Sequence, residues 1–294
     1  MGDLSQQWTR RDWLWLVGAS TLVGGALLRA QGGQRAWGVQ LYTVRDQLAK
    51  QPLETLKAIA GVGYKEVELF GPNTAKLVQL SKEAGLTPVG THIQTTDVLG
   101  DKTPAALDSF FDGIAKADLK YAVVGYIMPN DRGKDKEAFK KFGEEMNRVG
   151  ERAKKAGLQF GYHNHAFEFG KLSDGTRAID TIIETFDPAL VKFEVDVFWV
   201  SVTGNDPVEL ITKLGKRVGW VHLKDKAKGT PVKFEETVEK SAFAEVGSGT
   251  IDFPAVLKAA QAAGVGHYLV EQDFTPGDPI ASLKKSFDYL SHLT

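Results

Sequence analysis

Short apolar segments and helix-like segments alternate eight times between Val39 and the C-terminus. The predicted strands are Val39–Thr43, Glu66–Phe70, Thr87–His92, Tyr121–Tyr126, Leu158–Asn164, Lys192–Val197, Trp220–Lys224 and His267–Gln272. Between them, apolar residues recur at helical spacing, as in Pro52–Ala60, Thr74–Ala84, Lys136–Ala156, Pro207–Leu214 and Pro254–Ala263. Several of these segments end at a glycine, which is common just after a helix.

The repeated order of strand, helix and strand predicts parallel strands joined by right-handed crossovers. Eight such units favour an α/β fold of the closed (β/α)8 TIM-barrel type over an open sheet. The first strand is not followed by a GxGxxG motif, which argues against a dinucleotide-binding fold. We therefore expect one barrel domain over residues 37–292, a size that suits the chain length of 294 residues.

Polar residues share one face of several predicted strands. Residues two apart in a strand point to the same side, so the apolar set Leu158, Phe160 and Tyr162 leaves His163 and His165 on the other face. The same alternation places further polar side chains inside the barrel: Gln40, Tyr42, Glu68, His92, Glu194, Asp196, His222, Lys224 and Glu271. Buried charges cost several kcal/mol unless they are paired or bind a metal. Because active sites of this fold lie at the carboxyl ends of the strands, the pattern indicates an active site there.

The donor set predicts one divalent metal ion. The chain has no cysteine, so any metal must bind nitrogen and oxygen. We expect the ligands to be His163, Asp196, His222 and Glu271, with His165 as the alternative to His163. A structural role is the alternative for each: a hydrogen-bonded core histidine for His222, a loop cap for Asp196 and a paired carboxylate for Glu271.

Other polar residues near the strand ends are candidates for catalysis or substrate binding. Lys224 would bind an oxyanion or transfer a proton with a lowered pKa, unless it only forms a salt bridge. His165 would contact the substrate or support the metal ligands. The predicted substrate-binding residues are Gln40, Tyr42, Glu68, His92 and Glu168; Glu68 and His92 could instead pair with each other, and Glu168 could be an exposed loop acid.

Composition and charge limit the classes of partner. The chain is 43% hydrophobic and 25% charged, which is typical of a soluble globular domain. Its net charge of −1 gives no reason to expect a nucleic acid or a membrane surface as a partner of the mature domain. The composition does not indicate an oligomeric state.

The N-terminal segment resembles an export signal. Arg10 and Arg11 precede an apolar stretch that extends from Trp13 to Leu28, and Ala30 is a candidate cleavage point. We therefore expect residues 1–30 to be a twin-arginine signal and the enzyme to be periplasmic. The alternative is an uncleaved anchor, although the apolar stretch is shorter than the roughly 20 residues that a span usually needs.

The chain resembles the xylose isomerase-like TIM barrel superfamily, specifically its sugar phosphate isomerase/epimerase group. The resemblance covers about residues 37–292 and is carried by short motifs: residues 38–42 (GVQLY), 161–165 (GYHNH) with 167–169 (FEF), 195–196 (VD), 221–225 (VHLKD) and 270–271 (VE). It implies a single divalent metal, manganese, zinc, cobalt or magnesium, held from the last four strands by His163, Asp196, His222 and Glu271. His163 departs from the family, where a glutamate is expected.

The resemblance implies a sugar isomerase or epimerase that abstracts a proton next to a carbonyl held by the metal, with Glu271 as the base. His163 puts symmetric proton transfer between two carboxylates in doubt. This favours the alternative of a lyase or hydratase acting on an oxidised sugar such as a 3-keto-glycoside. A DNA-repair enzyme is another possible class within this resemblance. Its site would hold three metals with many more histidines, whereas this chain has only six histidines and a near-neutral charge. The last class is a sugar-binding barrel without activity.

Overall fold

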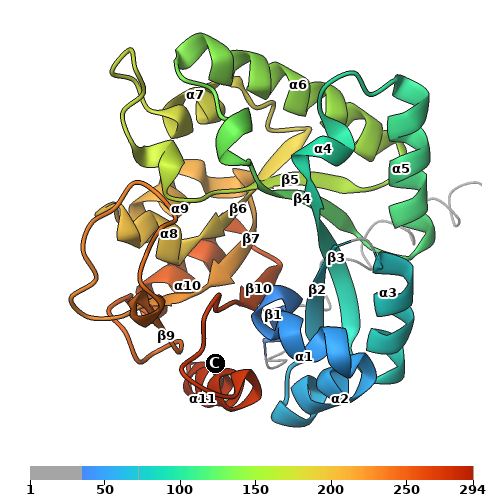
Figure 1. Ribbon diagram of the computed structural model, residues 1–294, viewed down its shortest axis with the longest axis vertical. Helices are drawn as coiled ribbons and strands as arrows, with labels where there is room; N and C mark the ends of the chain where they lie inside the picture. Colours follow the sequence, from blue (N-terminus) through green and yellow to red (C-terminus); the bar gives the residue numbers. More distant parts are fainter. Residues whose placement is uncertain (1–34, 72, 294) are drawn as a thin grey trace, which may run out of the picture. The chain divides into compact units, whose positions relative to one another are not determined.

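Eight parallel strands form a closed barrel in the computed structural model, which describes residues 35–71 and 73–293. Around the barrel, the strands follow the order β1, β10, β7, β6, β5, β4, β3 and β2. They are β1 (Trp37–Gln40), β2 (Glu66–Phe70), β3 (Thr87–Gln94), β4 (Tyr121–Tyr126), β5 (Gln159–His163), β6 (Val191–Asp196), β7 (Val218–Leu223) and β10 (His267–Val270). The prediction of a TIM barrel is therefore confirmed (Figure 1).

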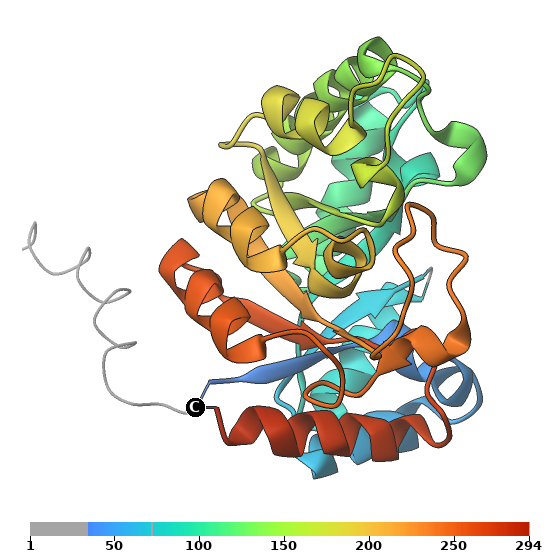
Figure 2. The ribbon, with the colours of Figure 1, turned by 90° about the vertical axis from the view of Figure 1, so that its left-hand side faces the viewer.

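Helices surround the barrel and cover the outer faces of its strands (Figures 1 and 2). The longer ones are α2 (Pro52–Val62), α3 (Thr74–Glu83), α5 (Pro104–Lys116), α6 (Lys136–Lys155), α7 (Ala178–Thr185), α9 (Pro207–Leu214), α10 (Phe253–Ala263) and α11 (Pro279–Ser291). The short ones are α1 (Arg45–Lys50), α4 (Thr95–Val98) and α8 (Val197–Val202). The described part of the chain contains no helix that meets the length and apolarity needed to cross a membrane.

Six strand ends differ from the prediction by one to three residues, and three of them affect where site residues lie. The first strand ends at Gln40, and residues 41–44 form a 3-10 turn because the Gln40 side chain accepts the Tyr42 N–H at 3.2 Å. Tyr42 therefore stands in this turn rather than on the inner face of a strand, and it is 40% exposed. The sixth strand ends at Asp196, which caps α8, and the last ends at Val270. Glu271 thus lies one residue beyond its strand.

The lower part of the barrel interior, on the side of the amino ends of the strands, is filled by apolar and aromatic side chains. Val89, Tyr121, Val123, Trp220 and Leu269 are all buried and form one cluster. The rings of Tyr121 and Trp220 are 4.2 Å apart between centroids. Glycines on other strands leave room for these rings, since a Cβ on Gly90 would lie 2.0 Å from Tyr121 and one on Gly161 would lie 2.5 Å from Trp220. The interior is therefore a packed core with no pore through it.

The predicted export signal, residues 1–30, lies outside the described residues. The elements of the barrel extend from Trp37 to Ser291, within the predicted range of 37–292.

Candidate active site

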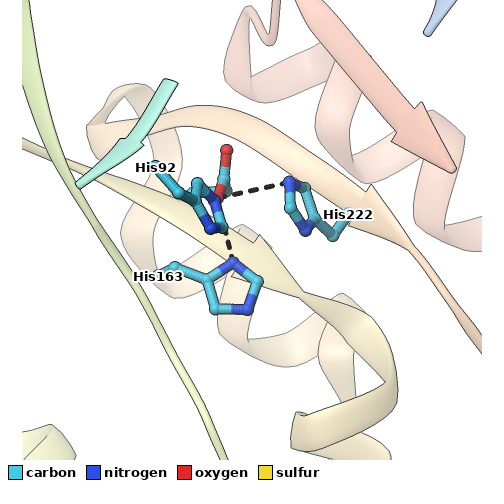
Figure 3. A group of neighbouring side chains, drawn as sticks. His92, His163 and His222 are labelled. Carbon is cyan, nitrogen blue, oxygen red and sulfur yellow. Dashed lines mark hydrogen bonds and ion pairs between the residues drawn. The ribbon is translucent and has the colours of Figure 1, made fainter. Parts of the chain in front are cut away.

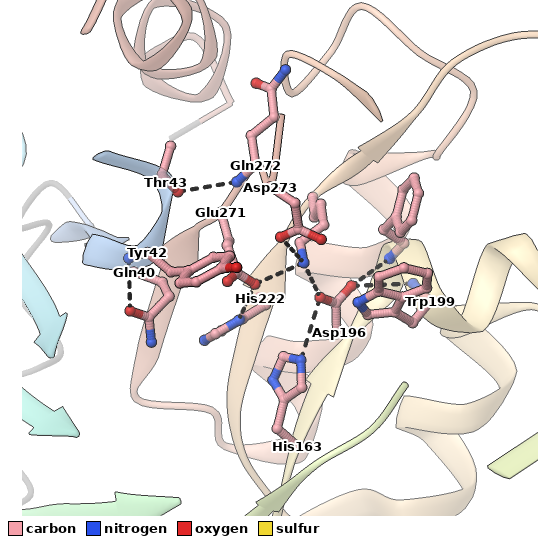
Figure 4. A network of polar contacts seen from close by, with 12 residues as sticks. Gln40, Tyr42, Thr43, His163, Asp196, Trp199, His222, Glu271, Gln272 and Asp273 are labelled. Carbon is pink, nitrogen blue, oxygen red and sulfur yellow. Dashed lines mark hydrogen bonds and ion pairs between the residues drawn. The ribbon is translucent and has the colours of Figure 1, made fainter. Parts of the chain in front are cut away.

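A cavity of about 340 Å³ lies at the carboxyl ends of the strands. Its lining combines polar residues predicted from the sequence with several aromatic rings: Tyr42, Phe70, His92, Tyr126, His163, His165, Trp199, Lys224, Phe243, Glu271, Asp273 and Phe274. Figure 4 shows how His163, Asp196, His222, Glu271 and Asp273 come together. Pockets with an apolar wall and a few convergent polar groups are typical of small-molecule sites.

The four predicted metal ligands lie together. His163, Asp196, His222 and Glu271 are all buried, and each offers a donor atom within 4.8 Å of the others. His163 Nε2 is 3.5 Å from Asp196 Oδ2, and His222 Nδ1 is 3.0 Å from Glu271 Oε2. Their placement as one cluster agrees with the sequence analysis, and their role as ligands stays a prediction.

Asp196 also has the structural role that the sequence analysis offered as the alternative. Its Oδ1 accepts the backbone N–H groups of Phe198 at 2.9 Å and Trp199 at 3.2 Å, so it caps helix α8. Asn164 Oδ1 accepts the Asp196 N–H at 3.1 Å and links the ends of β5 and β6. These bonds fix the carboxylate and leave Oδ2 directed at His163 and Lys224.

Lys224 lies among three carboxylates. Its Nζ is 2.9 Å from Asp196 Oδ2, 2.8 Å from Glu271 Oε2 and 3.0 Å from Asp273 Oδ1. Burial lowers the pKa of Lys224, but these carboxylates outweigh it and hold the pKa well above its usual range. The expected lowering of this pKa is thus not supported by these contacts, which favour the ammonium form. Lys224 is suited to donate a proton or to bind an oxyanion.

Glu194 occupies the centre of the cluster, although the sequence analysis gave it no role. Its Oε2 lies 2.6 Å from His92 Nε2, 2.9 Å from His163 Nδ1 and 3.2 Å from His222 Nε2. Figure 3 shows the imidazole rings of His92, His163 and His222 close to one another. Strand alternation places Glu194 on the inner face, two residues before Asp196, and this inward position is the sequence signal that points to it.

The charges of this region do not balance without protons or a metal. Five carboxylates, those of Glu68, Glu194, Asp196, Glu271 and Asp273, face one ammonium and three imidazoles. Burial lowers the pKa of His163 to about 3, which keeps it in the neutral form that binds metals. Burial also lowers the pKa of His92, but Glu68 and Glu194 raise it to about 10. A divalent cation would offset this excess of negative charge, so the donor set fits a metal ion.

Two predicted substrate-binding residues, Gln40 and Glu68, lie beneath the cavity. Both are fully buried and neither lines the cavity. Gln40 Nε2 donates to Glu68 Oε2 at 2.6 Å, and the same oxygen lies 2.8 Å from His222 Nε2. His92 pairs with Glu68 at 3.2 Å, as the alternative reading expected, and it also lines the cavity. The geometry thus favours a supporting position for Gln40 and Glu68.

Glu168 lies behind His165, away from the cavity lining. Its carboxylate is fully buried and accepts the Tyr162 hydroxyl at 2.5 Å and the His165 backbone N–H at 3.0 Å. Burial raises the pKa of Glu168 to about 7. His165 itself lines the cavity and packs at 4.8 Å from the Tyr126 ring. Glu168 is therefore buried and holds the loop that presents His165, so the alternative of an exposed acid is wrong.

A long excursion after β7 borders the cavity, and the sequence analysis missed it. Strands β8 (Asp225–Lys226) and β9 (Phe243–Ala244) pair in an antiparallel ribbon, and residues 227–242 connect them (Figure 2, orange). Glu236 in this connection bonds to Arg132 at 2.9 Å, and Arg132 also donates to the Tyr126 hydroxyl at 2.8 Å. Asp225 accepts four backbone N–H groups of residues 247–251 and holds the base of the excursion.

The chain belongs to the xylose isomerase-like TIM barrel family, whose model matches residues 56–293. Among curated proteins it is similar to the inosose dehydratase of Clostridium perfringens, with 30% identity over 170 residues, 54% of this chain and 56% of that protein. The inosose dehydratase of Geobacillus thermodenitrificans is 30% identical over 155 residues, 49% of this chain and 51% of that protein. The matches span about half the length of these relatives.

Solved structures share the fold. A sugar phosphate isomerase/epimerase from Parabacteroides distasonis superposes with a TM-score of 0.75 and 24% identity, covering 89% of this chain and 95% of that one. D-Psicose 3-epimerase from Clostridium cellulolyticum superposes with a TM-score of 0.62 and 14% identity, covering 88% and 99%. At 24% and 14% identity, these two structures show a shared fold.

Proposed function

We propose that this protein is a metal-dependent lyase that eliminates water or another leaving group from a keto-sugar or a related cyclic keto-polyol. The observation that carries the proposal is the placement of Lys224 Nζ 2.8 Å from Glu271 Oε2, both facing the cavity. An acid and a base lie side by side, whereas the position across from Glu271 in the cluster holds His163 in place of a second carboxylate. The similarity to inosose dehydratases supports the same reaction class.

In the proposed mechanism, the Glu271 carboxylate takes the proton from the carbon next to the substrate carbonyl. The electrons of that C–H bond first give an enolate. As the carbonyl re-forms, they become the new double bond, and the C–O bond to the hydroxyl on the next carbon breaks. Lys224 gives its proton to this hydroxyl, which leaves as water. Transfer of the proton from Glu271 back to Lys224, over their short contact, restores both groups.

His163, Asp196, His222 and Glu271 would hold a divalent metal, which when bound supplies a Lewis acid that polarises the carbonyl and stabilises the charge on its oxygen. His92 and His165 line the cavity and can hydrogen-bond to substrate hydroxyls. The aromatic wall formed by Tyr42, Trp199 and Phe274 can pack against the apolar face of the ring and exclude water.

Two readouts test this proposal. The protein loaded with Mn²⁺, Zn²⁺, Co²⁺ or Mg²⁺ is incubated in D₂O with a panel of keto-sugars, 3-keto-glycosides and inososes. Exchange of the hydrogen next to the carbonyl, followed by NMR, reports on proton abstraction, and mass spectrometry reports on the eliminated product. Full metal occupancy and substrate binding without exchange would instead support a sugar-binding barrel.

The second candidate is an isomerase or epimerase, which needs a second group to move a proton at the other side of the substrate. His165 lines the cavity, and its Nδ1 is buried with no hydrogen-bond partner among the described residues. Burial keeps the pKa of His165 well below its usual range, so the ring is neutral and can accept a proton. An isomeric product of unchanged mass would favour this reaction over elimination.

We also propose that the enzyme is exported to the periplasm through the twin-arginine signal in residues 1–30. Phosphorylated sugars are chiefly cytoplasmic, so this location agrees with an unphosphorylated substrate. Replacing Arg10 and Arg11 by lysine in a tagged full-length chain is expected to leave the protein in the cytoplasmic fraction. Unchanged export of this variant would contradict the proposed route.

A further inference from the structure

Glu194 is buried at the level of the metal-ligand candidates, but it does not line the cavity. It is fully buried in β6, and one of its oxygens, Oε2, contacts imidazole nitrogens that come from β3, β5 and β7. A buried carboxylate is costly unless its oxygens are satisfied, so this arrangement needs a reason beyond packing.

The two nitrogens of each candidate histidine ligand face different partners. His163 presents Nδ1 to Glu194 at 2.9 Å and Nε2 to Asp196 at 3.5 Å. His222 presents Nε2 to Glu68 at 2.8 Å and to Glu194 at 3.2 Å, and Nδ1 to Glu271 at 3.0 Å. Each ring therefore has one nitrogen on Glu194 and the other on a carboxylate of the candidate metal site.

This arrangement limits how metals can bind. Two groups of four residues lie close enough to hold an ion: His163, Asp196, His222 and Glu271 form one, and His92, His163, Glu194 and His222 form the other. Both groups need His163 and His222. A neutral imidazole has one nitrogen without a proton, so it can serve only one of the two positions. Glu194 is therefore either a ligand in the second group or an acceptor behind the first.

We infer that Glu194 is a positioning residue that orients the His163 ligand and, together with Glu68, the His222 ligand. It accepts the His163 Nδ1–H at 2.9 Å, which directs His163 Nε2 toward Asp196. The His222 Nε2–H lies between Glu68 Oε2 at 2.8 Å and Glu194 Oε2 at 3.2 Å, which directs His222 Nδ1 toward Glu271. A carboxylate behind a histidine ligand fixes the ring and strengthens its donor nitrogen, and loss of such a partner commonly weakens metal binding about 10- to 100-fold. The inference depends on the metal site of the proposed function.

The test compares Glu194→Gln with the wild type and with a matched control, Glu66→Gln. Glu66 also pairs with a histidine in the barrel, His267, at 2.8 Å, but on a different pair of strands and outside the cluster around Glu194. The dissociation constant for Co²⁺ is measured by competition with a chromophoric chelator, the visible absorption of bound Co²⁺ is recorded, and the thermal midpoint of the metal-free proteins is determined.

Glu194→Gln is expected to bind one Co²⁺ about 10- to 100-fold more weakly than wild type, with shifted visible bands, because an amide cannot accept from both rings in the same way. Glu66→Gln is expected to keep the wild-type affinity and bands. An unchanged affinity and spectrum in Glu194→Gln, even with a lower thermal midpoint, would show a purely structural carboxylate and overturn the inference. If Glu194→Gln binds no Co²⁺ while Asp196→Asn still binds it, Glu194 is a metal ligand. This result would also overturn the inference that Glu194 is a positioning residue.

Glu194→Asp covers the case in which the glutamine variant does not fold. It keeps the charge but shortens the side chain, so it cannot reach both rings, and the positioning role predicts weaker Co²⁺ binding. Wild-type affinity in Glu194→Asp would mean that only the charge matters and would contradict the inference. A wild-type protein that binds no Co²⁺ would refute the metal site of the proposed function. This outcome can be told apart from failure of the Glu194 inference, because it is seen in the wild type without any variant.

Discussion

The barrel interior contains two adjacent layers of opposite chemistry. The lower layer consists of Val89, Tyr121, Val123, Trp220 and Leu269, which pack with no charged group among them. The upper layer, at the carboxyl ends of the barrel strands, collects Glu68, His163, Glu194, His222 and Glu271. On β7 the change takes only two residues, from Trp220 to His222, which share the inner face.

The comparison separates stability from function within one interior. The apolar layer buries area and closes the barrel from below, so it contributes to folding. The polar layer is costly to bury and is retained because its groups hold one another in place, which suits chemistry. Changes in the upper layer should therefore affect reaction and metal binding first, and changes in the lower layer should affect unfolding first.

The largest expected effect comes from removing the base. Glu271→Gln keeps the size of the side chain but cannot take a proton, so the rate of hydrogen exchange next to the carbonyl should fall by about 10²- to 10⁴-fold. NMR in D₂O at saturating metal measures this rate. Glu66→Gln, at the other end of the barrel, is the control and should exchange normally. Equal loss in both variants would mean that the loss of exchange is not specific to the upper layer.

Lys224→Met should separate two steps of the reaction and also cost stability. Loss of the ammonium leaves Asp196, Glu271 and Asp273 facing one another, and removal of one partner from a buried ion pair typically costs about 3–5 kcal/mol. Urea unfolding of the metal-free protein measures this loss. In the folded variant, exchange should persist while elimination falls, because the base is present and the acid is absent. Full elimination activity would refute the assignment of Lys224 as the acid.

Glu168 should make stability depend on pH. Burial raises its pKa in the folded protein to about 7, above the ordinary value of 4.5 that we assign to the unfolded chain. Between these values the folded state binds more protons, so the contribution of Glu168 is complete below about pH 4.5 and is lost as pH rises to about 7, a change of roughly 3 kcal/mol.

Urea unfolding of wild type and Glu168→Gln at pH 5 and pH 7.5, in the presence of a chelator, measures this contribution. The fall in unfolding free energy between the two pH values should be smaller in Glu168→Gln than in wild type. An equal fall in both proteins would show that Glu168 does not titrate in this range.

The smallest expected effect is a pure packing change in the lower layer. A Cβ on Gly161 would lie 2.5 Å from the Trp220 ring, so Gly161→Ala should destabilise the protein by about 1–3 kcal/mol. The control is Gly61→Ala in helix α2, where no atom lies within 4 Å of the new Cβ and a gain of about 0.5–1 kcal/mol is expected. Thermal unfolding measures both. A Gly161→Ala variant with wild-type stability would mean that this layer is not tightly packed.

Much of the fold follows from local sequence. Alternating strand and helix patterns predict the eight barrel strands because each pattern reflects which face of an element is buried. Strands β2 and β4 and helix α9 have the predicted bounds. The end of β1 was misplaced because a side-chain bond from Gln40 starts a turn there, and the ribbon of β8 and β9 was missed because it depends on pairing across a long connection.

Which residues face inward follows from the order of residues along each strand, because side chains alternate whatever the neighbouring strands contain. This alternation indicated His163, Asp196, His222, Lys224 and Glu271. The folded barrel was needed to show which nitrogen of each histidine meets which carboxylate, that Lys224 lies among three acids, and that Glu194 contacts three rings. These contacts depend on the stagger between strands and on distances of a few ångströms, and such quantities arise only when the barrel closes.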